Sequence, residues 1–190
     1  MRTRTIIICL LVIIILYFLQ GCASDKPKLL MYGDGTMEDK AFLVDNAHAI
    51  KFKVPSGNWA IKSIRYYAIR FGMGQGQGRQ IVLTIADDSL QSIYENRVNH
   101  GYVDTVVEKW YSMDVSPPLY HPGDIWVILD TNSAQNEGIR IGVDTTVNVS
   151  HSGKGRVGGT ISDVDGSYDW MIRVELTKLS PQEMEKLRSG

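Results

Sequence analysis

Between about residue 40 and residue 176, hydrophobic and polar side chains alternate with a period of two, which predicts β-strands. The segment Ala49-Ile50-Lys51-Phe52-Lys53-Val54 shows this alternation, and the cluster Pro55-Ser56-Gly57-Asn58 that follows it predicts a turn. The next run, residues 59–71, is long enough to require a bulge or a bend. Residues 80–86 are almost continuously apolar, which favours a buried strand.

Shorter apolar segments, separated by Gly, Asp, Asn, Ser and Pro, predict the remaining strands. We expect them at residues 90–94, 103–113, 124–129, 138–143, 145–149, 156–161 and 169–176. Three prolines between residues 116 and 123 exclude a central strand there. Many short strands without alternating helices predict an all-β fold, a jelly-roll-like antiparallel β-sandwich.

One short helix is expected at the C-terminal end of the chain. Ser180-Pro181-Gln182-Glu183 offers an N-cap, a proline at the first helical position and a capping-box glutamate. The predicted organisation is a signal segment at 1–21, a tether at 22–39, the sandwich at 40–180 and the helix or tail at 181–190. A mature chain of this size forms one domain with a sizeable core.

The segment before the sandwich predicts where the protein is located in the cell and how it is attached to a membrane. Arg2 and Arg4 precede fourteen apolar residues, from Ile6 to Leu19, and Leu19-Gln20-Gly21-Cys22 follows as a lipobox. This pattern resembles the type II signal peptide of bacterial lipoproteins. The resemblance implies that Cys22 is acylated, after cleavage, as the first residue of the mature protein. The apolar run is shorter than the roughly 20 residues that a membrane-spanning helix needs, and stable attachment takes more than one acyl chain.

The same resemblance predicts the location. The lipoprotein pattern places the protein in the cell envelope, and Ala23 rather than Asp after the cysteine favours the outer membrane in a host with two membranes. Cleavage leaves 18 basic and 21 acidic residues, a net charge of −3. The mature chain therefore lacks the excess of positive charge that is typical of nucleic-acid-binding proteins. Cys9 leaves with the signal, so an intrachain disulfide and a cysteine metal cluster are both excluded from the mature chain.

Three carboxylates, Asp163, Asp165 and Asp169, lie within seven residues around Gly166. Hard calcium ions bind several oxygen ligands at such density, so a structural calcium site is one hypothesis. The complete EF-hand pattern is absent, and Asp-Gly is also an ordinary hairpin turn, which is the other hypothesis. No other cofactor is expected.

Catalytic signatures are weak. Ser150-His151-Ser152 downstream of Asp144 contains the residue types of a hydrolytic triad, without a Gly-x-Ser-x-Gly elbow. We therefore assign no catalytic residues, although a hydrolase that uses paired carboxylates stays open as a third hypothesis. The glycine-rich stretch 72–78 joins two strands and does not open a helix, so it favours a rim loop over a phosphate loop.

Aromatic side chains give the functional hypothesis. Sugar rings stack on Trp and Tyr while polar groups fix their hydroxyls, so β-sandwich lectins use aromatic residues in rim loops. Tyr102, Tyr120 and Tyr168 lie near predicted strand ends or loops, and we name them, with Asp165, as candidate ligand contacts.

The closing part of the chain carries a second resemblance. Gly142-Val143-Asp144, Ser150 and the run Asp169-Trp170-Met171-Ile172-Arg173-Val174 are similar to the last strands of envelope-associated jelly-roll modules of the galactose-binding type. The resemblance implies a fold and an accessory ligand-binding role, and it assigns no sugar contact. Arg173, between apolar neighbours, is expected to pair with an acid such as Asp144 or Asp130.

These observations predict a lipid-anchored, non-enzymatic binding module of the bacterial envelope. Its first expected ligand is a carbohydrate or cell-wall polymer. The alternative partner is an envelope protein, for which the chain would act as an accessory or structural subunit. An aromatic-lined groove would favour the sugar, and an exposed strand edge would favour the protein.

Overall fold

The computed structural model describes residues 26–72, 78–164 and 166–189. Cys22 and the lipobox, the centre of the glycine-rich stretch and Asp165 lie outside the described residues. Within the described part of the chain, no helix has the length and apolar character that crossing a bilayer requires.

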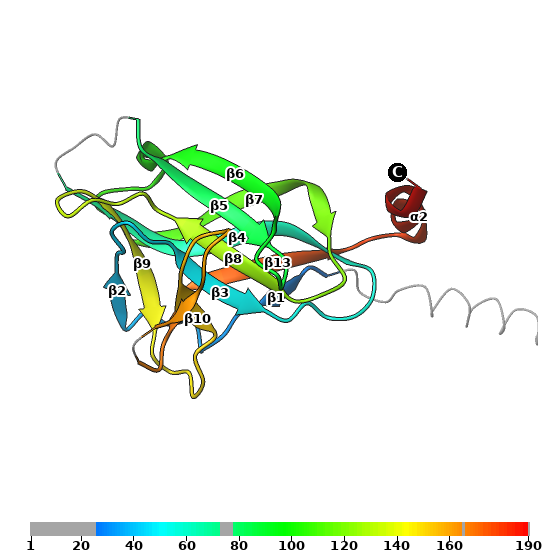
Figure 1. Cartoon of the computed structure of the whole chain (residues 1–190), viewed down its shortest axis with the longest axis horizontal. Helices are drawn as coiled ribbons and strands as arrows, with labels where there is room; N and C mark the ends of the chain where they lie inside the picture. The colour runs from blue at the N-terminus through cyan, green and yellow to red at the C-terminus, as the bar shows by residue number, and fades with distance from the viewer. Residues whose placement is uncertain (1–25, 73–77, 165, 190) are drawn as a thin grey trace, which may run out of the picture.

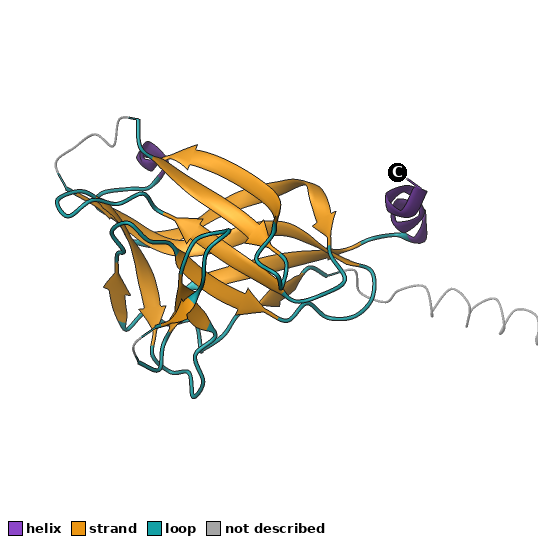
Figure 2. Cartoon of the chain, in the orientation of Figure 1, coloured by secondary structure: helices purple, strands orange, loops and turns teal. Residues whose placement is uncertain are grey.

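Two antiparallel sheets pack face to face (Figures 1 and 2), which confirms the predicted all-β sandwich. The seven-stranded sheet has the order β1 (Lys28–Leu30), β13 (Ile172–Lys178), β4 (Trp59–Phe71), β9 (Gly138–Asp144) and β12 (Asp169–Trp170), with β2 (Asp39–Ala41) beside β9 and β7 (Lys109–Tyr120) beside β4. The six-stranded sheet has the order β11 (Ser162–Asp163), β10 (Ser152–Lys154), β3 (His48–Phe52), β8 (Ile125–Asp130), β5 (Gln80–Ala86) and β6 (Ser92–Asn99).

The core lies between the two sheets because alternate side chains of each strand point inward. Ile50 and Phe52 of β3 belong to the same apolar cluster as Ile64 and Tyr66 of β4, and all four are essentially inaccessible to solvent. Each fully buried side chain of this size stabilises the fold by about 1.5–3 kcal/mol relative to an exposed one. Packing of the two inner faces therefore holds the sandwich together.

Strand β4 organises the seven-stranded sheet. Its first part pairs with β13 on one side and β7 on the other, and its last four residues pair with β9. The register with β7 shifts between Ile61 and Ser63, as the length of this strand predicted. The two prolines Pro117 and Pro118 lie within β7, which continues to Tyr120. The strand tolerates them because β4 is its only backbone partner among the described strands.

Two predicted strands are wrong. Residues 145–149 form a loop, because the backbone N–H and hydroxyl of Thr146 bond to Asp144 and turn the chain away from the sheet. Residues 156–161 also form a loop, in which the N–H of Gly159 bonds to the carbonyl of Arg156 and Gly158 has a φ of +77°. Alternating apolar and polar side chains do not form a strand where no partner strand lies alongside.

The first strand of the sandwich lies earlier in the chain than expected, and the C-terminal helix lies where it was expected. The fold begins at Lys28, inside the segment expected to be a tether, because β1 pairs with β13. The short 3₁₀ helix η1 (His100–Tyr102) joins β6 to β7, and α2 (Pro181–Ser189) follows β13. The capping box at α2 is present: Ser180 N–H donates to Glu183 Oε2 at 2.7 Å, and Glu183 N–H donates to Ser180 Oγ at 3.3 Å.

Candidate functional site

An open hollow of about 460 Å³ lies at the rim of the sandwich, where the segment after β1 meets the connection between β9 and β10. In Figure 1 that connection is the yellow-to-orange loop at the lower edge of the molecule. We call it the rim hollow. Its lining residues are Tyr32, Gly33, Thr146, Val147, Asn148, Val149 and His151.

A column of three rings ends in the rim hollow. The Tyr32 ring lies on Phe52 of the core, with centroids 5.3 Å apart and an interplanar angle of 13°. The His151 imidazole lies on the other side of Tyr32, with centroids 3.6 Å apart and an angle of 2°. Burial raises the pKa of Tyr32, so its phenol stays neutral at physiological pH. The core thus presents the imidazole as the outermost ring of the column.

A buried carboxylate fixes the orientation of this imidazole. Asp169, only 1% exposed, lies with Oδ2 3.1 Å from His151 Nδ1 and accepts the His151 backbone N–H at 2.7 Å. Its Oδ1 also accepts the hydroxyl of Ser152 at 2.7 Å. The carboxylate and the ring stack together hold the imidazole in one orientation.

The residues that suggested a hydrolytic triad are arranged differently. His151 contacts Asp169 and not Asp144, and the Ser150 hydroxyl donates to the Tyr168 carbonyl at 2.7 Å. The hydroxyl of Ser152 donates to the same carboxylate, not to the imidazole. Ser150 and Ser152 therefore hold the loop and the carboxylate, and neither is placed as a nucleophile activated by His151.

Three carboxylates converge beside the rim hollow. Oxygen atoms of Asp34, Glu38 and Asp144 lie within 4.8 Å of one another. Asp144 is 1% exposed and accepts the backbone N–H of Gly35 at 2.9 Å and that of Thr146 at 3.0 Å. Hydrogen bonds from Thr36 lower the pKa of Asp34. Oxygen ligands at this spacing could hold a hard cation.

The predicted calcium ligands lie apart from that cluster. Asp163 is exposed in the two-residue strand β11, opposite Gly153. Asp169 turns its carboxylate inward toward His151 and Ser152, and Asp165 lies outside the described residues. Calcium binding by these three residues stays a prediction.

Two of the candidate tyrosines lie near opposite ends of β7. Tyr102, 50% exposed, packs its ring edge-on against Tyr111 and donates its hydroxyl to the Ser112 carbonyl at 3.0 Å. Tyr120 is the last residue of β7 and packs against Met184 of α2 and its neighbours. Tyr120 lies nine positions after Tyr111, which in an extended strand corresponds to about 30 Å. The two side chains therefore do not line one groove.

The third tyrosine lies closer to the rim hollow. The Tyr168 ring packs edge-on against Trp170, with centroids 5.1 Å apart, and its carbonyl accepts the Ser150 hydroxyl. Tyr168 contributes to the support of the rim, and it is not among the residues that line the rim hollow. Sugar contacts by Tyr102, Tyr120, Tyr168 and Asp165 stay predictions.

The lining residues of the rim hollow were missed as ligand contacts. Tyr32 lies in the segment that was assigned to the tether, and His151 was considered only as part of a triad. Asn148 lies in the segment 145–149, which was expected to form a strand. The run Met31-Tyr32-Gly33-Asp34-Gly35, with an aromatic ring, an acid and two glycines, was the local signal.

Arg173 does not make the expected ion pair. Its guanidinium carbon lies 3.8 Å from the centroid of the Trp110 ring, and Nη2 donates to the Gly35 carbonyl at 3.4 Å. Asp130 instead pairs with Arg156, with Oδ2 2.9 Å from Nε. Burial lowers the pKa of Arg173, and the Asp144 charge raises it to a smaller extent, without a direct ion pair. The side chain thus holds the segment that carries the acidic cluster against the seven-stranded sheet.

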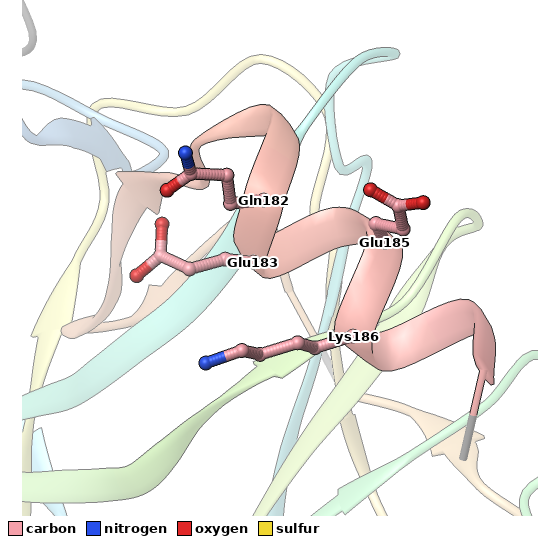
Figure 3. Close-up of a pocket in the computed structure, with 4 residues that line it drawn as sticks. All are labelled: Gln182, Glu183, Glu185 and Lys186. Carbon is pink, nitrogen blue, oxygen red and sulfur yellow. The ribbon is translucent and has the colours of Figure 1, made fainter.

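A second hollow lies on α2 and lacks the features of a site. Figure 3 shows its lining side chains, Gln182, Glu183, Glu185 and Lys186, all of which belong to this single helix. A ligand cleft normally draws its walls from several elements and buries most of the ligand. This hollow is the side of an exposed helix.

No protein-family model and no curated protein matches this chain. Among solved structures, the clostridial cysteine protease Cwp84 after propeptide cleavage is similar, with a TM-score of 0.61 and 11% identity. A structure of the cysteine protease and lectin-like domains of Cwp84, a surface layer associated protein of Clostridium difficile, has a TM-score of 0.52 and 13% identity. Both alignments cover 82% of this chain, but it spans only 41% and 36% of those chains. At such identity the likeness shows the fold alone.

Proposed function

We propose that this chain is a non-enzymatic binding module of the bacterial cell envelope that takes a carbohydrate or cell-wall polymer in the rim hollow. The observation that carries the proposal is the ring column Phe52–Tyr32–His151, which ends with an oriented imidazole in that hollow. A flat ring set among polar groups suits a sugar, which has an apolar face and a rim of hydroxyls.

The rest of the lining supplies both kinds of contact. Val147 and Val149 add apolar surface beside the imidazole, and Val149 is 68% exposed. Thr146 and Asn148 alternate with them. The Asn148 amide can both donate and accept hydrogen bonds, whereas the Thr146 hydroxyl donates its hydrogen to Asp144 and can only accept one from a ligand. An apolar wall with a few convergent polar groups is typical of a small-ligand site.

The envelope location rests on two independent arguments. The lipobox at Leu19-Gln20-Gly21-Cys22 proposes a lipid anchor on Cys22. The similarity in fold to Cwp84, whose second structure includes a lectin-like domain and which is associated with a surface layer, supports a binding module at a cell surface. In this proposal the membrane holds the chain through its lipid and the sandwich stays free to bind.

The anchor is tested separately from the ligand. Cys22→Ser removes the thiol that would be acylated, so the variant is expected to leave the membrane fraction and to lose palmitate labelling. A variant that is still cleaved before residue 22 and still sediments with membranes would overturn the lipoprotein proposal.

A binding screen tests the ligand. The full chain, purified in detergent, is titrated with soluble peptidoglycan fragments and a panel of oligosaccharides. Binding is expected to weaken at least tenfold in His151→Ala and in Asn148→Ala, and to be unchanged in His121→Ala, a histidine in another loop. No binding to any fragment, or equal weakening in all three variants, would contradict the proposal. The same samples, assayed for released reducing ends, test the hydrolase hypothesis.

A protein partner is the second candidate function. Val106 and Val107, at 82% and 53% exposed, lie in the loop between η1 and β7 near the half-exposed Tyr102. Exposed apolar side chains grouped in one loop favour a protein contact. Crosslinking in the native envelope, with Val106→Ser as the comparison, would reveal such a partner as a product that the variant loses.

A further inference from the structure

The outer face of the six-stranded sheet is apolar at its centre. Strand register places Ala49 of β3 and Thr84 of β5 on either side of Ile128 of β8. Ala47 and Ala86 extend the same apolar cluster, and all of these residues are buried. The outer face of an antiparallel sheet that meets only water is normally polar. This apolar patch, covered in part by the loop after β10, forms the floor of a hollow.

Two walls bound this floor. On one side, Val157 and Ile161 of the loop after β10 pack against the cluster. On the other side stands Arg97 of β6, opposite Val82 in the register. The space between the walls is a hollow of about 260 Å³, which we call the sheet-face hollow. It is lined by Val82, Thr84, Arg97, Ile128, Asp130, Arg156 and Val157.

The charges around the sheet-face hollow are already balanced. Arg97 Nη2 lies 2.6 Å from Glu95 Oε1, and Arg156 Nε lies 2.9 Å from Asp130 Oδ2. Each guanidinium carries five N–H groups and uses only one or two of them in these pairs. Both arginine side chains are at least half exposed. The walls therefore offer hydrogen-bond donors without a net charge, which suits an uncharged ligand rich in hydroxyls.

The floor continues beyond the hollow along β8. Trp126 is the next outward-facing residue after Ile128 and packs against the same apolar cluster, with Lys51 Nζ 5.9 Å from its ring centroid. From Asp130 to Trp126 the strand spans about 13 Å at 3.3 Å per residue. This length accommodates more than one ring of a linear sugar chain.

We infer that the sheet-face hollow is a second binding site, separate from the rim hollow, for an uncharged segment of a polysaccharide chain. The apolar faces of the sugar rings lie on Val82 and Val157, which are half-buried and lie beside the buried Ile128. Their hydroxyls bond to Arg97 and Arg156. A polymer that engages both hollows binds more tightly than either hollow allows, because the second contact is intramolecular. The sheet-face hollow shares no lining residue with the rim hollow, so it is an additional site beyond the one proposed above.

The test uses the full chain in detergent and three uncharged probes, chitohexaose, cellohexaose and mannohexaose. The double variant Arg97→Ala/Arg156→Ala removes the donors of the walls and leaves the floor intact. At least one hexasaccharide is expected to bind the unaltered chain and to bind the double variant at least tenfold more weakly. A probe that binds the sheet-face hollow alone should keep its affinity in His151→Ala, because that substitution alters only the rim hollow. A probe that engages both hollows should be weakened by either change.

Lys62→Ala is the matched control, since it removes an exposed ion pair, with Glu175, from the other sheet. Melting temperatures within a few degrees of the unaltered chain establish that each variant is folded. Affinity should also be constant between about 0.05 and 0.5 M NaCl, because an uncharged ligand forms no ion pair to screen. The inference is overturned if no probe binds, if Lys62→Ala weakens binding equally, or if only His151→Ala weakens it. That last result would still support the rim hollow.

Discussion

A histidine sealed in the core makes stability depend on pH. His48 of β3 has no exposed surface, and neither of its ring nitrogens has a hydrogen-bond partner among the described residues. Its ring packs edge-on against Trp170, with centroids 4.3 Å apart. Burial, with a smaller contribution from the Lys154 charge, lowers the pKa of His48 to about 3. The folded protein therefore keeps this imidazole neutral, whereas the unfolded chain binds a proton near pH 6.5.

The sign and size of the effect follow from proton linkage. Between pH 6.5 and about 3 the unfolded state binds one proton more than the folded state at His48, so acidification favours unfolding. The free energy of unfolding falls by about 1.4 kcal/mol for each pH unit below 6.5. From pH 7 to pH 4.5 the loss is about 2.7 kcal/mol. That is a large fraction of the 5–15 kcal/mol by which domains are typically stable.

Urea unfolding of the unaltered chain and of His48→Leu, each at pH 7 and at pH 4.5, measures the effect. The leucine variant is expected to lose about 2.7 kcal/mol less over this interval, because it has no proton to take up on unfolding. The pKa of His100 is also lowered by burial, but His100 is present in both proteins and cancels. Phe52→Leu, on the same inner face of β3, should keep the unaltered pH dependence. Equal losses in the unaltered chain and in His48→Leu would refute the reasoning.

Three further predictions concern the rim, the helix and the ion. Gly33 has a φ of +73°, and a Cβ there would overlap the Asp144 carboxylate. Gly33→Ala should therefore lower the free energy of unfolding, measured with urea, by about 1–3 kcal/mol and weaken glycan binding. Unchanged stability would show that the segment adjusts without cost. Ser180→Ala removes the cap of α2 and should cost this helix about 1 kcal/mol, seen as faster amide exchange within α2 alone. Calcium at 100 times its Kd should raise stability by about 2.7 kcal/mol if the predicted site exists. Loss of that gain in Asp163→Asn supports the prediction, loss in Asp34→Asn moves the ion to the acidic cluster, and an unchanged melting temperature with chelator removes both.

Regular strands were predictable because their periodicity is local. The expected strands at 59–71 and 80–86 coincide with β4 and β5, and the bulge in β4 followed from its length. The same alternation failed at 145–149, where Thr146 bonds back to Asp144 and no strand lies alongside. A strand is defined by its partner as much as by its own pattern, and the partner lies far away in the chain.

The candidate sites were far less predictable. Tyr32 and His151 stack although 119 positions separate them, and Asp34 approaches Asp144 across 110 positions. Neither pair has a spacing that a local motif could show. The pairing of β1 with β13 is what brings the first of these segments onto the sandwich.

The amino-acid sequence by itself determined the fold class, most strand positions, the helix cap and the prediction of a lipid anchor, because each depends on neighbouring residues. Only the tertiary structure decided which side chains share a hollow, which acids converge and which histidine is sealed away from water. Those properties arise when distant strands pair and two sheets close over a core, and burial and contact between distant segments exist only after that closure.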